Sequence, residues 1–395
     1  MVQVAAAAVV VVVAVAASVQ AQDTEWVVSR KTTEGVWTSV ASNGLAELIA
    51  VQIDSSNQRD QLMRSRDAGE TWRELAAPEG DQSKWHVITH GRGDESRAAY
   101  VMVSEGPGSI GTNKIAYSED SGDTWQLSTT FNSQNRWQDI AYADGVFVTV
   151  VNIKNTDAIA KSTNFGKDWF SEQTPFAGAG EWFSIAANHG ASGNRMFVVV
   201  GDCRDRTTDS SCVMTQTYDK SIAGPWTLQT APAARWRSID FGNNYFIAVS
   251  NDPEEDAVRG MRSFDGITWE ALITIADKPW IAIAFGSNVF VAVSSTGAVS
   301  RTFDDGMTFY DMSVPAQVAT NYWTAVTVAL NNVFVAVSLD GAPNQAMTYL
   351  APLDPTAPTL PPTVPPGSGG GSTGVIVIVS VLFVLLAVSL IVYFS

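Results

Sequence analysis

The sequence is poor in metal-binding side chains and in positive charge. Its 395 residues include 2 cysteines and 3 histidines, which leaves almost no room for a Cys/His zinc site. Lysine and arginine number 24 against 40 aspartates and glutamates, so the formal net charge is -16. Nucleic-acid binding requires a basic face that releases counterions, and none is expected here. We predict no nucleic-acid partner, no metal ion and no cofactor.

Long apolar runs occur only near the two ends of the chain. Residues 4–17 contain only alanine and valine, and a cut after Ala21 would leave small residues at the expected cleavage positions. This pattern predicts a signal peptide over residues 1–21, although no Lys or Arg precedes the run. A membrane anchor is the alternative, for which the run is short. The chain is therefore expected to enter the secretory pathway.

The second apolar run covers residues 375–394 and is about 30 Å long as a helix. A linker rich in Pro, Gly, Ser and Thr, residues 351–374, precedes it, and its prolines favour a stiff, extended spacer. Two interpretations stay open, a single-pass transmembrane helix and a GPI-attachment signal. Both place the protein on the extracellular side of the plasma membrane, attached through its C-terminal segment.

Between these ends a short motif, Ser-x-Asp-x-Gly-x-Thr-Trp, recurs. Two copies are complete, residues 65–72 and 118–125, and three are looser, in residues 162–169, 263–269 and 302–309. Residues 217–226 form a longer variant. Asp and Asn bond the amides of their own turn, and Gly adopts positive φ, so the motif predicts structural turns. Their key residues are Ser65, Asp67, Gly69, Trp72, Ser118, Asp120, Gly122, Trp125, Asn164, Gly166, Trp169, Asp265, Gly266, Trp269, Asp304, Gly306 and Phe309.

Tryptophans mark the period of the repeat. Seven of them open strand-like segments at intervals of 43 to 54 residues: Trp37, Trp85, Trp137, Trp182, Trp236, Trp280 and Trp323. An apolar second strand, a third strand, a turn and a fourth strand follow in most units. This pattern predicts an all-β fold, a seven-bladed β-propeller over residues 23–350. The seventh unit lacks a fourth strand, which residues 23–29 around Trp26 are expected to supply.

The turns resemble the Asp-box (BNR) repeats of the sialidase-like propeller superfamily. The resemblance covers nearly all of residues 23–350 and implies the propeller fold. The superfamily contains sialidases and other glycosidases, and also non-catalytic sorting receptors and assembly factors. Sialidases use three arginines, an Arg-Ile-Pro segment and a Tyr–Glu pair, and we cannot match these residues here. No catalytic residue is therefore predicted, and a divergent sialidase-clan exo-glycosidase is kept as the alternative.

Ligands of propellers usually bind the face built by the loops from strand two to three and from strand four to one. In the fourth unit such a loop contains Arg204, Asp205 and Arg206 between Cys203 and Cys212. Outside the cell these cysteines are expected to form a disulfide, and the loop is our candidate ligand-binding site. An inert stapled loop is the plainer interpretation. The acidic loop 251–256 is expected to be solvated, and the three histidines to be ordinary surface or core residues.

Three functions follow as hypotheses. The first is a membrane-tethered cell-surface module that binds a protein or a glycan without catalysis. The second is the glycoside hydrolase just described, and the third is a structural surface or assembly protein. The fold, the tether and the lack of a recognisable catalytic constellation favour the first.

Overall fold

A computed structural model describes residues 26–351, apart from the gaps 31, 33–34, 54–61, 79–83, 94–96, 105–113, 129–136, 152–158, 173, 176–180, 189–194, 203–211, 219–223, 255–256, 331 and 341–344. The predicted signal peptide, almost all of the linker and the apolar segment 375–394 with its predicted helix lie outside these residues. Within the described part, no helix is both long enough and apolar enough to cross a bilayer.

The described residues form seven four-stranded sheets, here called blades 1 to 7. Blade 1 consists of β2 (Trp37–Ser42), β3 (Leu48–Gln52), β4 (Leu62–Ser65) and β5 (Arg73–Leu75). Blade 2 consists of β6 (Trp85–Arg92), β7 (Ala98–Ser104), β8 (Ile115–Ser118) and β9 (Gln126–Leu127). Blade 3 consists of β10 (Trp137–Ala143), β11 (Val146–Val151), β12 (Ile159–Ser162) and β13 (Phe170–Glu172).

Blade 4 consists of β14 (Glu181–Ala187), β15 (Met196–Asp202), β16 (Val213–Thr217) and β17 (Thr227–Gln229). Blade 5 consists of β18 (Trp236–Gly242), β19 (Tyr245–Ser250), β20 (Gly260–Ser263) and β21 (Glu270–Leu272). Blade 6 consists of β22 (Trp280–Gly286), β23 (Val289–Ser294), β24 (Val299–Thr302) and β25 (Tyr310–Met312). Blade 7 consists of β26 (Trp323–Ala329), β27 (Val333–Ser338), β28 (Ala346–Leu350) and β1 (Val27–Val28). One short 3-10 helix, η1 (Ala316–Val318), lies between blades 6 and 7.

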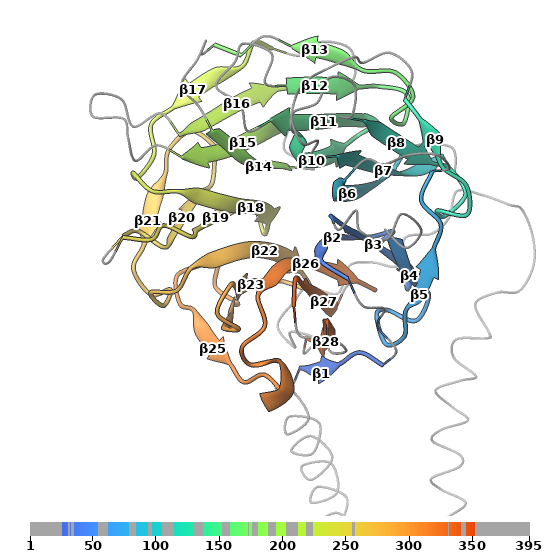
Figure 1. Ribbon diagram of the computed structural model, residues 1–395. Coiled ribbons are helices and arrows are strands. Elements are labelled where there is room, and N and C mark those ends of the chain that lie inside the picture. Colours follow the sequence, from blue (N-terminus) through green and yellow to red (C-terminus); the bar gives the residue numbers. More distant parts are fainter. Residues whose placement is uncertain are drawn as a thin grey trace, which may run out of the picture. The chain divides into compact units, whose positions relative to one another are not determined.

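The blades surround a common axis (Figure 1). The first strand of each blade lies nearest this axis and the fourth lies at the rim, and neighbouring strands within a blade are antiparallel. The fold is a seven-bladed β-propeller, and the predicted number of blades is confirmed. The tryptophans open the innermost strands as expected, although β14 begins one residue earlier, at Glu181.

The N-terminal strand closes the ring. In β1, Val27 pairs with Thr348 of β28 and Val28 pairs with Met347. The preceding Trp26 is only 1% exposed, and its ring centre lies 5.4 Å from that of Tyr349. Blade 7 is thus completed by the opposite end of the domain, as the sequence predicted, so β28 is paired on both sides.

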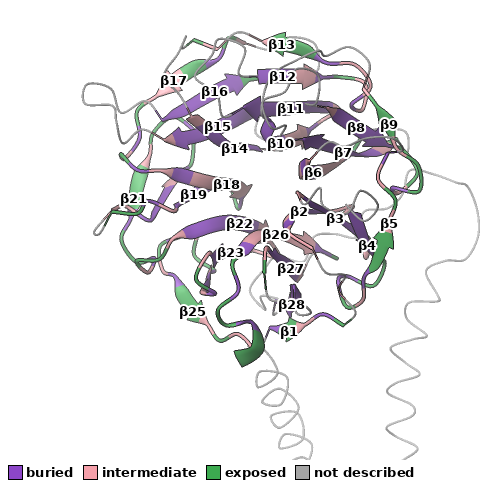
Figure 2. Ribbon diagram, viewed as in Figure 1, coloured by how far each residue is buried: buried purple, intermediate pink, exposed green. Residues whose placement is uncertain are grey.

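The hydrophobic core lies between the blades. The second strands β3 and β11 are buried at every position, because the blades on either side cover both of their faces (Figure 2). A typical cluster joins Trp37 and Met63 of blade 1 to Val335 and Val337 of blade 7. The valine-rich runs therefore lack apolar–polar alternation for a physical reason, since neither face meets water.

The repeated turns share one hydrogen-bond pattern. In blade 2, Ser118 Oγ donates to Asp120 Oδ1 (2.8 Å) and accepts from the Gly122 amide (2.8 Å). Asp120 Oδ1 also accepts from the Thr124 amide (2.8 Å). The same three contacts recur in blades 1, 3, 5 and 6, with Asn164 replacing the aspartate in blade 3. Burial raises the pKa of Asp120, but hydrogen bonds from Thr124 and Ser118 outweigh it and leave the pKa below its usual value.

The turn glycines also make contacts between blades. Gly122 has φ +79°, and a Cβ atom there would lie 2.5 Å from Ile49 Cδ1 of blade 1. Gly69, Gly166, Gly266 and Gly306 have positive φ as well, and each faces side chains of the preceding blade. Each turn therefore requires glycine for its backbone conformation and for the close approach of two blades.

Gly122→Ala is expected to destabilise the propeller by about 2 kcal/mol, because it adds left-handed backbone strain and overpacks Ile49. Chemical denaturation measures this loss. Gly145→Ala is a matched control, since Gly145 has φ +92° but nothing within 4 Å of its missing Cβ. Equal losses in both variants would contradict a packing role for Gly122.

Candidate functional site in the central channel

Each innermost strand begins with an irregularity of register. In all seven described pairs of first and second strands, the shift falls between the opening tryptophan and the residue two positions later, for example between Trp137 and Asp139. A β-bulge of this kind redirects side chains. It lets consecutive residues after the tryptophan reach the channel instead of alternate ones.

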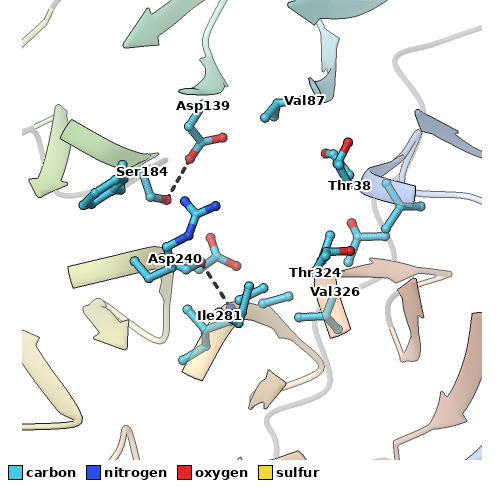
Figure 3. Close-up of a pocket in the computed structure, with 18 of the residues that line it drawn as sticks. Thr38, Val87, Asp139, Ser184, Asp240, Ile281, Thr324 and Val326 are labelled. Atoms are coloured by element: carbon cyan, nitrogen blue, oxygen red, sulfur yellow. Dashed lines mark hydrogen bonds between the residues drawn. The ribbon is translucent and has the colours of Figure 1, made fainter. Parts of the chain in front are cut away.

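These residues line a cavity of about 230 Å³ at the axis. Its lining is apolar on blade 6, from Ile281 to Ala284, and contains charged and polar side chains on blades 2 to 5: His86, Gln138, Asp139, Ser184, Arg237 and Asp240. Figure 3 shows Asp139, Asp240 and Thr38 directed toward the centre of the channel from three separate blades.

Most polar side chains of the lining connect one blade to the next. Ser39, Ser184 and Ser238, each two residues after an opening tryptophan, accept from the amides of Ile88, Ile239 and Ile283 in the following blade, each at 3.2 Å. Thr38 Oγ1 donates to the carbonyl of His86 at 2.7 Å, and Thr324 Oγ1 donates to that of Trp37 at 2.7 Å. These contacts hold the blades at fixed angles.

Asp139 occupies the same position as these serines. Its Oδ2 accepts from Ser184 Oγ (2.7 Å, the upper dashed line in Figure 3) and from the Ile185 amide (2.9 Å), while Oδ1 accepts from the Ile140 amide (2.8 Å). Burial raises the pKa of Asp139 above its usual value, although these hydrogen bonds and the charge of Arg237 act in the opposite direction. Asp139 therefore makes the serine-type contact between blades with a carboxyl group.

Asp240 lies four residues after its opening tryptophan, Trp236, whereas Asp139 lies two residues after Trp137. Its Oδ1 accepts from the Phe241 amide (2.8 Å) and its Oδ2 from the Phe285 amide of blade 6 (2.7 Å). Burial raises the pKa of Asp240 to about 6, and the nearby charge of Asp139 contributes to the increase. The two carboxylates thus share one electrostatic environment, and a proton is easily held there in mildly acidic solution.

His86 and Arg237 complete the polar sector. Burial, together with the charge of Arg237, lowers the pKa of His86 to about 3, so this imidazole is neutral at physiological pH. Its Nε2 lies 2.9 Å from Gln138 Nε2 of the next blade. The Arg237 guanidinium stacks over the ring of Phe183, 5.5 Å from the ring centre. The sector is therefore a fixed array with one permanent positive charge.

The lining does not contain the sialidase constellation. Among the described residues that line the cavity, Arg237 is the single arginine, and neither glutamate nor tyrosine occurs. Both carboxylates hold backbone amides, which fixes them in place. The part of the chain that the structure describes also contains no cluster of three His, Cys, Asp or Glu side chains arranged to bind a metal ion.

The ligand-binding loop predicted from sequence is not among the described residues. Arg204, Asp205, Arg206 and Cys203 lie in the gap 203–211, so their role and the disulfide with Cys212 stay predictions. Cys212 itself is buried beside Pro232. The turn residues predicted as structural, from Ser65 to Phe309, lie between the third and fourth strands, away from the channel lining.

One expectation from the sequence was wrong in part. In the described part of the acidic loop, residues 251–254, Pro253 and Glu254 are exposed as expected, but Asp252 is 4% exposed. Its carboxylate accepts from the amides of Arg235 and Glu254, each at 3.1 Å. The Arg259 guanidinium donates to the carbonyls of Asp252 and Glu254. His86 lies in the channel lining beside Gln138, a position that the sequence did not indicate.

Sequence reasoning also missed Asp139, Arg237 and Asp240. A usable signal existed, because each lies within four residues of an opening tryptophan, in a strand that is otherwise apolar or neutral. A charged residue that close to the axis of a propeller is costly to bury unless it is paired. Such positions therefore merit attention in any sequence with this period.

Comparisons with known proteins support the fold. No protein-family model matches the sequence, and no curated protein is significantly similar to it. Among solved structures, one described as "YCF48 bound to D1 peptide" superposes with a TM-score of 0.56 at 13% identity, covering 83% of this chain and 95% of the other. YCF48 from Cyanidioschyzon merolae gives 0.52 at 13% identity, covering 82% and 98%. The WD40 propeller of Doa1 gives 0.57 at 12% identity, covering 82% and 96%. At these identities the similarity establishes a β-propeller and no closer relationship.

Proposed function

We propose that this protein is a membrane-tethered module of the extracellular surface that binds a protein or a glycan and does not catalyse a reaction. The observation that carries the proposal is the state of the channel. Its carboxylates and hydroxyls donate to or accept from neighbouring blades, so they form a rigid, preorganised surface. Rigid surfaces bind with little loss of conformational entropy.

The tether rests on the two terminal segments. Residues 1–21 direct the chain to the secretory pathway, and residues 375–394 attach it to the membrane as a transmembrane helix or after exchange for a lipid anchor. The linker 351–374 separates the propeller from the bilayer. From the residues that the repeated turns share, we also infer that they are Asp-box repeats with a structural role.

A protein partner is favoured over a glycan by two observations. Among the described residues of the channel lining, Arg237 is the single arginine and Phe183 the single Phe, Tyr or Trp, whereas sugar-binding sites usually stack rings on exposed aromatic side chains. The comparison structures include one in complex with a peptide and another described as "Mitotic Checkpoint Complex", of 9% identity and TM-score 0.55. The proposed docking face contains the channel mouth and the loop with Arg204 and Arg206.

Photo-cross-linking on intact cells tests the proposal. The full-length chain receives a photoreactive amino acid in place of Val87, in the channel, or in place of Arg204. A discrete cross-linked protein is expected from both positions and not from Phe170, a control that is 64% exposed on the outer strand β13. A glycan array is probed in parallel.

Absence of any cross-linked protein and of any bound glycan would contradict the binding function. Hydrolysis of a fluorogenic glycoside that is lost in Asp139→Asn would establish the glycosidase alternative instead.

A further inference from the structure

Two of the repeated turns differ from the others in their exposed residues. Each turn has a variable pair, the residue after the opening Ser or Thr and the residue after the glycine. In blades 1 to 3 these pairs are polar: Arg66 and Glu70, Glu119 and Asp123, Thr163 and Lys167. In blades 5 and 6 they are Phe264 with Ile267, and Phe303 with Met307.

The four apolar side chains are exposed to solvent. The exposed fraction is 66% for Phe264, 51% for Ile267, 41% for Phe303 and 61% for Met307. The turns do not need them, because the hydrogen bonds that fix each turn come from its Ser or Thr, its Asp and its glycine. The polar pairs of blades 1 to 3 show that polar residues serve equally well there.

The two turns form one continuous surface. Arg262 Nη1 of blade 5 donates to the carbonyl of Asp305 in the turn of blade 6, at 2.9 Å. Thr274 Oγ1 of blade 5 donates to the carbonyl of Met307 at 2.8 Å, which places the neighbouring Ile273, 94% exposed, beside that turn. Figure 2 shows β21 and β25, the adjoining outer strands, as largely exposed. We call Phe264, Ile267, Ile273, Phe303 and Met307 the apolar turn surface.

The surroundings of the apolar turn surface are acidic. Residues 263–274 and 302–312 contain five acidic side chains and no Lys or Arg. The nearest arginines are already engaged, since Arg262 pairs with Glu270 at 2.5 Å and Arg301 stacks over Phe303 at 4.9 Å. An apolar surface with a negative rim complements a partner that has apolar and basic residues.

We propose that the apolar turn surface docks a polypeptide segment that combines apolar side chains with lysines or arginines. The apolar side chains pack between the turns of blades 5 and 6, and the basic groups meet Asp305 and Asp311. This surface is separate from the channel lining. It is built from the loops between the third and fourth strands of blades 5 and 6 and from Ile273, which follows β21, and none of these residues lines the channel cavity. It goes beyond the proposed function and does not depend on it.

A peptide-display experiment tests the proposal. The full-length chain is screened against a random 16-residue peptide library, and the enriched peptides are titrated by fluorescence anisotropy. We expect peptides with both apolar and basic residues, and at least a tenfold weaker affinity for Phe264→Ser/Met307→Ser. Thr163→Ser/Lys167→Ser alters the equivalent pair in blade 3 and is expected to leave the affinity unchanged. Phe264, Met307 and Thr163 are exposed, so substitution at these positions should leave the melting temperature almost unchanged. Lys167 is only partly exposed and pairs with Glu119 at 2.9 Å, so the control variant should show a small decrease in melting temperature but stay folded.

Other results would overturn the proposal. Enriched peptides without basic residues, no enriched peptides at all, or equal affinity for both variants would exclude this docking mode. A dimer that becomes a monomer in Phe264→Ser/Met307→Ser would assign the surface to a second copy of the chain. Binding to phosphatidylcholine vesicles that weakens in that variant would assign it to lipid. Enriched peptides that bind the channel face instead would support the proposed function but contradict docking at the apolar turn surface.

Discussion

Trp26→Ala is expected to destabilise the propeller by about 3–5 kcal/mol, the usual loss for truncating a buried tryptophan. Trp26 is 1% exposed and packs against Tyr349 and the apolar side chains between blades 6 and 7. It also anchors β1, which pairs with β28 and gives blade 7 its fourth strand. The melting temperature should fall by on the order of 10 °C.

Differential scanning calorimetry of the full-length chain measures this effect. Val27→Ala is the matched control, since Val27 is in the same strand but 62% exposed, and it should change the melting temperature little. A comparable fall in both variants would contradict a special packing role for Trp26, because Val27 is exposed. No fall in Trp26→Ala would contradict the role of this residue in closing the ring.

His86→Gln is expected to reduce the sensitivity of the protein to acid. The pKa of His86 is lowered to about 3 in the folded state, against 6.5 in the unfolded chain. Between these values the unfolded state binds one proton more than the folded state, so stability falls as the pH falls. From pH 6.5 to pH 4 this one residue costs about 3 kcal/mol.

Other groups titrate in the same range and must be separated from His86. The pKa of Asp240 is raised to about 6, so between about pH 4 and pH 6 the folded state binds more protons at this residue than the unfolded state. The contribution of Asp240 to the stability of the fold therefore decreases as the pH rises through this range. Burial and the charge of Arg92 lower the pKa of His90 to about 4, which acts in the same direction as His86. Because both groups are present in wild type and variant, subtracting the two stability curves removes them to first order.

The measurement is urea denaturation of wild type and His86→Gln at several values between pH 4 and pH 7.5. The difference in free energy of unfolding should change by about 3 kcal/mol across this range, in favour of the variant at low pH. A constant difference would show that His86 titrates normally and that the channel is wetter than its geometry indicates.

The sequence predicted the frame of the fold well, for a physical reason. The tryptophans at the start of the inner strands and the Asp and Gly of the turns each satisfy a local requirement that recurs in every blade. Trp280 and Asp304 therefore mark their places without knowledge of any distant residue. Even the closure of blade 7 followed from counting, since Trp26 was the one tryptophan without a blade.

The channel could not be predicted in the same way. The bulge after each opening tryptophan changes which residues face the axis, so a period of two gives the wrong assignment beyond it. Asp139 and Asp240 lie two and four residues after their tryptophans and both reach the channel. Their partners, Ser184 and Phe285, belong to the following blades, 45 residues away in each case.

Contacts between blades were missed for a related reason. Arg64 is 2% exposed, and its guanidinium donates to the carbonyl of Ser121 and to Asp123, each at 2.6 Å, in the turn of the next blade. Arg262 has the equivalent position in blade 5 and reaches Asp305. An arginine directly before the turn serine is therefore a signal for such a contact. It can be recognised only after the blades have been aligned with one another.

A strand from the N-terminal end completes the last of seven blades. Disulfide formation between introduced cysteines tests this closure most directly. Val27 and Thr348 are opposite one another in the sheet, within reach of a disulfide. Val27→Cys/Thr348→Cys should therefore cross-link under mild oxidation, as detected by peptide mapping, whereas Val27→Cys/Leu350→Cys, displaced by two residues, should stay largely reduced. Equal cross-linking in both pairs, or none in the first, would contradict the closed seven-bladed ring.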